Sequence, residues 1–202
     1  MTITHNIQLI DGSGAPVDAL LLEQIDPQYT GVAESLWLTY IALQNASLVA
    51  AGQPIPTLDH DHWKWTQKVT KTYNLLPTPT FAIQCNGDTQ GMMMLETALH
   101  QCRLAGQKSS PLVYVDLLAS APWNLGVYEP TRHRGIGTLL LQAAIQTSLD
   151  LGFKGRIGLH SLPGADDFYE KKCNMACDGH DANKHGLKYY EMTPTLATAF
   201  MP

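Results

Sequence analysis

The chain has 202 residues, of which 45% are hydrophobic and 15% are charged, and its formal net charge at pH 7 is -5. This composition is typical of a globular protein and excludes a chain that is disordered throughout. The negative charge argues against nucleic acid or an anionic membrane surface as the main partner. Four irregularly spaced cysteines are too few for a disulfide scaffold, which favours a reducing compartment.

The amino terminus, MTITHNIQLIDGSG, has no basic segment followed by an apolar one, and no window approaches the roughly 18 apolar residues of a membrane span. We therefore expect a cytoplasmic protein without a signal peptide. Because the chain shows no linker and no internal repeat, we expect one domain over residues 1–202.

In the first part of the chain, helices are expected to outnumber strands. IQLID at 7–11 predicts a short strand that the turn DGSGAP closes. AESLWLTYIALQNA at 33–46 places apolar residues at helical spacing and predicts an amphipathic helix. After the prolines of AGQPIPTLD, HDHWKWTQKVTKTYNLL at 60–76 predicts a second helix.

The periodicity then changes to that of strands. TFAIQCN at 80–86 and MMMLETAL at 92–99 predict two strands of a meander joined by the turn GDTQG. PLVYVDLLAS at 111–120 is rich in β-branched and aromatic residues, which is typical of a central strand. APWNLGVYEPT at 121–131 has the Pro, Asn and Gly of a loop.

The last third predicts alternating helices and strands: a helix at 136–151, a strand at 156–161, a short helix at 164–173 and a strand at 187–193. Helices, then a meander, then alternating strands and helices indicate one mixed α/β sheet.

The stretch RHRGIG at 132–137, directly before the helix, is suited to binding an anion. Gly135 and Gly137 let a phosphate approach the backbone, and Arg132 and Arg134 offer charge-assisted hydrogen bonds beside a helix amino terminus. A P-loop is a poor match because no Lys-Ser/Thr pair follows, and a dinucleotide fingerprint is a poor match because Leu140 stands at the third glycine. A third phosphate-binding pattern, the spacing Arg-x-x-Gly-x-Gly, is matched by Arg132, Gly135 and Gly137.

This spacing resembles motif A of the GNAT N-acetyltransferase superfamily. LASAP at 118–122 looks like the strand end that precedes that motif, and ADDFYEKKCNM at 165–175 looks like a segment that follows it. The resemblance covers residues 80 to about 192. Three departures accompany it: an insertion, WNLGVYE, at 123–129; Leu162 at a position that usually holds Asn; and NM, after one extra residue, in place of GF.

The resemblance implies a mixed, mostly antiparallel sheet of six or seven strands flanked by helices. It also implies direct transfer of an acetyl group from acetyl-coenzyme A to a primary amine, without a metal, and it admits a homodimer. The donor would be bound at the end of the central strand and at the glycine loop, through Leu118, Ala119, Ser120, Arg132, His133, Arg134, Gly135, Ile136, Gly137 and Thr138.

The resemblance makes Tyr169 the acid that protonates the departing thiolate, although Tyr169 could equally be a core aromatic residue. Asp116 is a carboxylate in an apolar strand, an expensive position unless the charge is used or paired. Alternation along the strand places Asp116 on one face with Leu118 and Ser120, so it is our candidate for the base or for recognition of the amine. Glu96 is the second candidate on the same reasoning.

Two further features keep alternatives open. Trp123 and Asn124 begin the insertion and form either a wall of the substrate site or an anchor that buries the indole. Cys173, Cys177, His180 and His185 follow one another at a spacing too compressed for a zinc finger, so we expect no metal site. A noncatalytic module that binds an acyl-coenzyme A is the alternative to an enzyme, and a protein that binds ATP or NAD at the glycine loop is a third reading.

Overall fold

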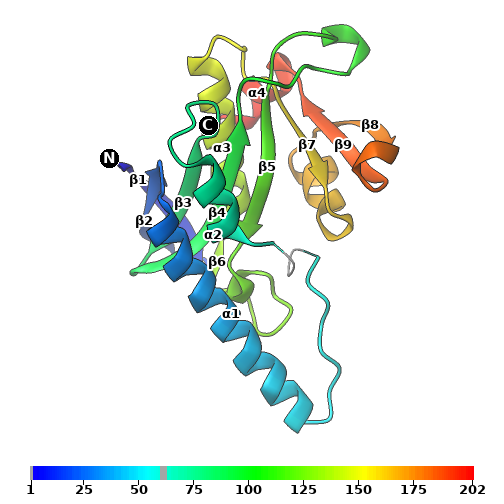
Figure 1. Cartoon of the computed structure of the whole chain (residues 1–202). Coiled ribbons are helices and arrows are strands. Elements are labelled where there is room, and N and C mark those ends of the chain that lie inside the picture. The colour runs from blue at the N-terminus through cyan, green and yellow to red at the C-terminus, as the bar shows by residue number, and fades with distance from the viewer. Residues whose placement is uncertain (1, 60–62) are drawn as a thin grey trace. The chain divides into compact units, whose positions relative to one another are not determined.

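The computed structural model describes residues 2–59 and 63–202. It has a mixed α/β architecture, in which one open and mostly antiparallel sheet is flanked by helices (Figure 1). The predicted fold class is therefore confirmed. The strand count is a correction, since the described residues form nine strands, in the order β6-β1-β2-β3-β4-β5-β7-β9-β8, and not six or seven.

The chain divides into two compact units. The expectation of one domain over residues 1–202 stays a prediction. The first unit comprises Met1–Leu75, Thr80–Met92 and Ala119–Gly137, and the second comprises Leu76–Pro79, Met93–Leu118 and Thr138–Pro202.

The first unit carries an antiparallel sheet in which β1 pairs with β2 and with β6, and β2 pairs with β3. Strand β2 follows the predicted turn directly, and neither it nor the two-residue strand β6 was expected. The turn before β4 is tighter than expected, because Asn86 and Gly87 both have positive φ and β4 starts at the next residue. The strands are β1 (Ile3–Asp11), β2 (Pro16–Glu23), β3 (Thr80–Cys85), β4 (Asp88–Glu96) and β6 (His133–Arg134).

Helix α1 (Pro27–Ala50) begins before the predicted helix and ends after it. The Asp26 carboxylate accepts a hydrogen bond from the backbone N–H of Tyr29 at 2.7 Å and caps the first turn. Pro27 occupies the first turn, where its missing N–H costs nothing. Local capping thus explains an earlier start than the apolar spacing predicts.

Helix α2 (Trp65–Thr72) is shorter than the predicted helix at 60–76, of which residues 60–62 lie outside the described part of the chain. Its amino terminus is capped from another helix. Glu34 of α1 accepts hydrogen bonds from the backbone N–H groups of Trp65 at 2.8 Å and Thr66 at 3.2 Å. A carboxylate also suits the positive end of the helix dipole.

In the second unit, β7 lies between a parallel and an antiparallel neighbour. It pairs with β5 in parallel and with β9 in the antiparallel sense, and β9 pairs with β8. Strand β8 and helix α4 were not expected. The elements are β5 (Val113–Ser120), α3 (Ile136–Asp150), β7 (Ile157–Ser161), β8 (Ala176–Asp181), β9 (Leu187–Met192) and α4 (Pro194–Phe200).

The short helix predicted at 164–173 is helical, but of another type than expected. It consists of a 3₁₀ turn at Pro163–Ala165 and a single π-helical turn at Phe168–Lys172. Further 3₁₀ turns lie at Ala105–Gln107, Pro122–Asn124 and Ala182–Lys184. Helix α3 agrees with the prediction, and Gly152, at φ +75°, follows its end.

Candidate functional site

The glycine loop before α3 has the backbone that an anion site requires. His133 and Arg134 pair with Asp11 and Ile10 of β1, and the chain then turns at Gly135, whose φ is +91°. A Cβ at Gly135 would meet no described atom within 4 Å, so one side of the loop is open. Helix α3 starts at Ile136 and has no acidic residue in its first turn. Its free N–H groups and the helix dipole therefore favour an anion here.

The side chain of a buried glutamine makes hydrogen bonds to this loop and to the residues before it. Gln90 of β4 is 2% exposed, and its Oε1 atom accepts hydrogen bonds from Trp123 Nε1 and Asn124 Nδ2, both at 2.9 Å. The same Oε1 lies 3.1 Å from Nδ1 of His133. Because an amide oxygen only accepts, Nδ1 must carry the proton. Burial lowers the pKa of His133, which favours its neutral form.

Asn124 completes this arrangement, because its Oδ1 accepts a hydrogen bond from the backbone N–H of His133 at 2.9 Å. Trp123 is 3% exposed and meets the ring of Tyr40 edge to face, at 5.4 Å between centroids. Both side chains thus make the contacts of an anchor for the insertion at 123–129. Their expected role in contacting a substrate stays a prediction.

The two arginines of the loop differ in their surroundings. The side chain of Arg132 is 46% exposed, and its Nε donates to Glu129 at 2.8 Å. Its guanidinium carbon also lies 5.4 Å from the ring centroids of Tyr40 and Trp123. Arg134 is exposed. Arg132 would therefore share its guanidinium between Glu129 and any anion at the loop, whereas Arg134 lies at the surface.

Strand β5 presents its candidate residues on one face. Asp116, Leu118 and Ser120 are half-buried, whereas Val115, Leu117 and Ala119 between them are buried. This alternation is the one expected of a strand. Asp116 is therefore on the same face as the two residues to which the resemblance gives backbone contacts with the donor.

Tyr169 lies in the π-helical turn and is buried, with its ring centroid 5.2 Å from that of Phe168 and 6.0 Å from that of Tyr190. Burial raises the pKa of Tyr169 above its ordinary value, so the hydroxyl stays protonated at neutral pH. A protonated hydroxyl is what a proton donor needs, but a core tyrosine would have it too.

Glu96, at the end of β4, is half-buried and is joined to His100 by a contact of 2.6 Å between Oε2 and Nε2. The His100 ring stacks on Tyr114 of β5, with centroids 4.1 Å apart. Glu96 is thus connected to the face of β5 that carries Asp116, although its expected role toward a substrate stays a prediction.

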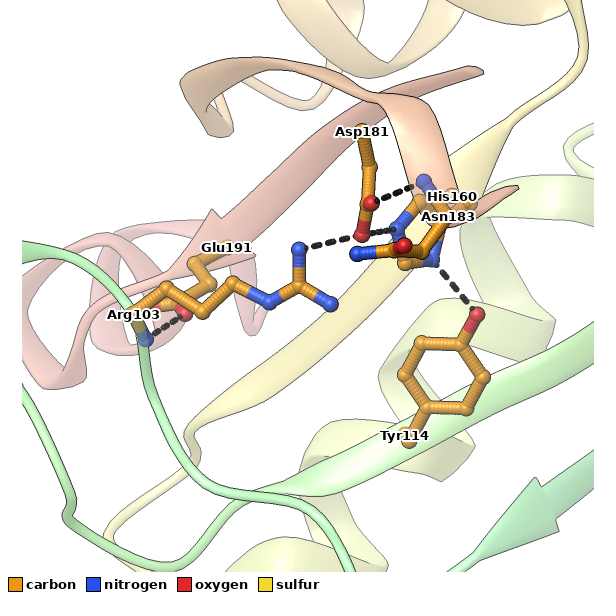
Figure 2. A network of polar contacts seen from close by, with 6 residues as sticks. All are labelled: Arg103, Tyr114, His160, Asp181, Asn183 and Glu191. Atoms are coloured by element: carbon orange, nitrogen blue, oxygen red, sulfur yellow. Dashed lines mark hydrogen bonds and ion pairs between the residues drawn. The ribbon is translucent and has the colours of Figure 1, made fainter. Parts of the chain in front are cut away.

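A polar network that the sequence did not predict lies in the second unit (Figure 2). Tyr114, His160 and Asp181 form a series of hydrogen bonds, and Arg103 donates at 2.6 Å to the same Asp181 oxygen, Oδ2, that His160 contacts. The buried Glu191 accepts from the backbone N–H groups of Arg103 and Leu104. Arg103, Tyr114, His160 and Asp181 come from four separate segments of the sequence, so no local pattern could have revealed this network.

The cysteine and histidine cluster at 173–185 gives no sign of a metal. Cys173 is buried and Cys177 is exposed, and Nδ1 of His180 contacts the carbonyl oxygen of Gly186 at 2.8 Å. Across residues 2–59 and 63–202, no group of three or more His, Cys, Asp or Glu side chains could hold a metal ion. No helix within these ranges is long and apolar enough to cross a bilayer.

Comparisons with known proteins show which family and which fold the chain resembles. Residues 57–175 match the model of the Acetyltransferase (GNAT) family. The GNAT domain of S. lividans PAT is 12% identical with a TM-score of 0.51, and the match covers 93% of this chain and 96% of that one. This likeness supports the fold. The comparison with curated proteins finds no match.

Two other solved structures resemble the chain more loosely. An acetyltransferase from Thermus thermophilus is 13% identical with a TM-score of 0.48, over 83% of this chain and 92% of that one. The Bacillus subtilis N-acetyltransferase YlbP, solved in complex with coenzyme A, is 17% identical with a TM-score of 0.43, over 57% of this chain and 68% of that one.

Proposed function

Because this chain belongs to the GNAT acetyltransferase family, we propose that it is an N-acetyltransferase that transfers the acetyl group of acetyl-coenzyme A directly to a primary amine. The observation that carries the proposal is the glycine loop at 133–137. There the positive φ of Gly135, the open side of the loop and a first turn of α3 without acidic residues fit a pyrophosphate. The buried Gln90 holds that loop in place.

We assign donor binding to two segments of the chain. The backbone of Leu118, Ala119 and Ser120 in β5 would pair with the pantetheine arm as an added strand does. The loop and the first turn of α3 would bind the pyrophosphate, through Arg132, His133, Arg134, Gly135, Ile136, Gly137 and Thr138.

The transfer needs a free amine and a protonated leaving group. The amine nitrogen forms a bond to the thioester carbon, the carbon–sulfur bond breaks, and the thiolate takes up a proton. Tyr169 is our proton donor, because its pKa is raised and its hydroxyl remains protonated. Asp116, half-buried on the donor face of β5, would recognise or deprotonate the ammonium group, with Glu96 as the second carboxylate.

The negative net charge and the carboxylates Asp116 and Glu96 favour a cationic acceptor, either a small molecule or a protein. A noncatalytic member of the family that only binds an acyl-coenzyme A is the alternative, which the buried position of Tyr169 favours. The two candidates differ in one measurable respect, since the sensor binds the donor without releasing thiol.

The first experiment is a calorimetric titration with acetyl-coenzyme A, with ATP and NAD as matched controls. Saturable binding of acetyl-coenzyme A alone would support the donor site, and binding of only ATP or NAD would overturn it. Thiol release is then measured with tyramine, spermidine and a hexapeptide with a free amino terminus. Release with any of these amines favours the enzyme, whereas donor binding without release favours the sensor.

A further inference from the structure

His160 of β7 stands between two partners that the proposed function does not use (Figure 2). Its Nδ1 lies 2.7 Å from the hydroxyl of Tyr114, and its Nε2 lies 3.0 Å from Oδ2 of Asp181. The side chain of His160 is 4% exposed and that of Asp181 is 11% exposed. Both hydrogen bonds are therefore largely shielded from water, which strengthens them.

The chemistry of the three groups determines which atoms carry protons. A carboxylate only accepts hydrogen bonds, so Nε2 of His160 carries a hydrogen and donates it to Asp181. Burial lowers the pKa of His160, which favours the neutral imidazole. Nδ1 of a neutral ring must then accept, and the hydroxyl of Tyr114 donates to it. The Tyr114 oxygen retains a lone pair for another donor.

Asp181 is held in its ionised form. The Arg103 guanidinium lies 2.6 Å from its Oδ2, and the backbone N–H of Asn183 donates to its Oδ1 at 2.9 Å. Together with His160, these groups lower the pKa of Asp181 to about 2. The carboxylate can therefore stabilise an imidazolium at His160 without taking the proton itself.

The position of these groups relates them to Asp116, the carboxylate that we assign to the acceptor. The pairing of β5 with β7 runs over Val113–Val115 and Ile157–Leu159, so that Asp116 and His160 are the next residue of each strand. Tyr114 precedes Asp116 by two positions and shares its face of β5. After burial, the carboxylates of Asp116 and Glu96 are the main causes that raise the pKa of Tyr114. That negative field favours a cation near its hydroxyl.

We propose that Tyr114, His160 and Asp181 form a proton relay that deprotonates the acceptor ammonium group, an inference that rests on the proposed N-acetyltransferase function. The ammonium N–H bond breaks as its proton reaches the Tyr114 oxygen, directly or through one water molecule. The O–H bond of Tyr114 breaks as its own proton moves to Nδ1 of His160. The amine keeps the electron pair with which it attacks the thioester carbon.

In this relay Tyr114 meets the amine, whereas His160 and Asp181 act through it. The imidazolium remains paired with Asp181 until it returns its proton to solvent. An imidazole is a stronger base than an ordinary carboxylate, so Asp116 is left to recognise the ammonium group. Other charged and titratable groups face the relay from the packed segments, namely Arg103 on Asp181, Lys184 and His100 at the Tyr114 ring, Tyr189 at the His160 ring, and Glu96 and Asp116 near Tyr114.

The test measures kcat from pH 6 to pH 10 with the amine of the panel that gives the fastest thiol release. We expect His160→Gln and Tyr114→Phe to lower kcat at pH 7 by about 10²-fold, the usual contribution of general acid–base catalysis. The loss should shrink toward pH 10, because more of the bound amine is then deprotonated without the relay. His180→Gln is the matched control, since it removes an exposed histidine of strand β8 and should leave the profile unchanged.

A structural role of the cluster would lower kcat equally at every pH, and that result would overturn the relay. Retention of the wild-type profile by both variants would overturn it as well. Calorimetric titration with acetyl-coenzyme A shows whether each variant is folded, and Tyr114→Phe tests the relay alone if His160→Gln does not fold. Failure of the proposed function is distinguishable, because the wild-type protein would then release no thiol with any amine.

Discussion

The Oε1 atom of Gln90 lies 3.1 Å from Nδ1 of His133, inside the first unit of the chain. A side chain of strand β4 thereby determines the position of a loop that follows it by more than forty residues. The same oxygen accepts hydrogen bonds from the side chains of Trp123 and Asn124, the first two residues of the insertion. The insertion is therefore tied to the glycine loop through one buried amide.

We predict that Gln90→Leu weakens the binding of acetyl-coenzyme A while leaving kcat nearly unchanged at saturation. The substitution keeps the volume but leaves the Trp123 indole, the Asn124 amide and the His133 ring without their acceptor. Each buried donor left unsatisfied costs about 1 to 3 kcal/mol. Calorimetric titration gives the affinity and thermal unfolding gives the stability.

Gln84→Leu is the control for this prediction, because the Gln84 side chain of β3 donates a hydrogen bond of 3.3 Å to the carbonyl of Gly87 at an exposed turn. Unaltered donor affinity in Gln90→Leu would show that the glycine loop keeps its shape without the glutamine.

A second prediction concerns the backbone of Gly135. Gly135→Ala places a Cβ at φ +91°, a conformation that costs an L-residue about 1 to 2 kcal/mol. Gly14→Ala is matched to it, because Gly14 has a φ of +94° and also lies next to open space, in the turn between β1 and β2. We expect similar losses of stability in thermal unfolding but a loss of acetyl-coenzyme A affinity only in Gly135→Ala. Equal affinities of the two variants for acetyl-coenzyme A would show that the loop does not bind the pyrophosphate.

The glycine loop shows what could be predicted from the sequence. The spacing Arg-x-x-Gly-x-Gly before a helical period identified both the family and the start of α3 at Ile136, because both depend on neighbouring residues. Gln90, His160 and Asp181 were not predicted, because each acts through partners far away in the chain. A buried glutamine or a strand histidine carries no local signal of such partners.

The missed elements have physical causes as well. Strand β8 reads ACDGHD, which lacks an apolar face, and it lies at the edge of the sheet, where alternating burial is not required. Strand β6 has two residues and exists through its pairing with β1. The start of helix α2 at Trp65 was not predicted because its cap, Glu34, comes from another helix.

A third prediction concerns Gly158 of β7. A Cβ at this position would lie 2.5 Å from the hydroxyl oxygen of Tyr189 and 3.2 Å from a methyl group of Leu112. Both side chains are buried, so neither can move away without disturbing the core. Gly158→Ala should lower the free energy of unfolding by about 1 to 3 kcal/mol, measured by denaturant titration. Gly106→Ala, where no described atom lies within 4 Å of the new Cβ, should be close to neutral, and equal stability of the two variants would contradict the packing at Tyr189.

A fourth prediction separates catalysis by Tyr169 from packing. Tyr169→Phe keeps the ring contacts with Phe168 and Tyr190 and removes only the hydroxyl. If that hydroxyl protonates the thiolate, kcat should fall by about 10²-fold while the affinity for acetyl-coenzyme A stays the same. Tyr190→Phe serves as the control, since the Tyr190 hydroxyl makes a long contact of 3.4 Å with Glu170. Full activity of Tyr169→Phe would show that Tyr169 packs in the core and does not act in catalysis.

The last prediction uses the carboxylate of Asp181, whose pKa falls from 3.8 to about 2 because Arg103, His160 and the backbone of Asn183 bind its charged form. A carboxylate whose pKa is lowered by folding stabilises the protein at pH values above its pKa in the unfolded state. This contribution is lost as the pH falls from about 4 to about 2. Asp181→Asn should therefore be less stable than the wild type at pH 5, and the difference should shrink at pH 2. Urea titration at both pH values measures it. Asp88→Asn, which changes the net charge equally at an exposed position, corrects for the general effect of charge. A difference of the same size at both pH values would mean that Asp181 stabilises the fold through its shape and not through its charge.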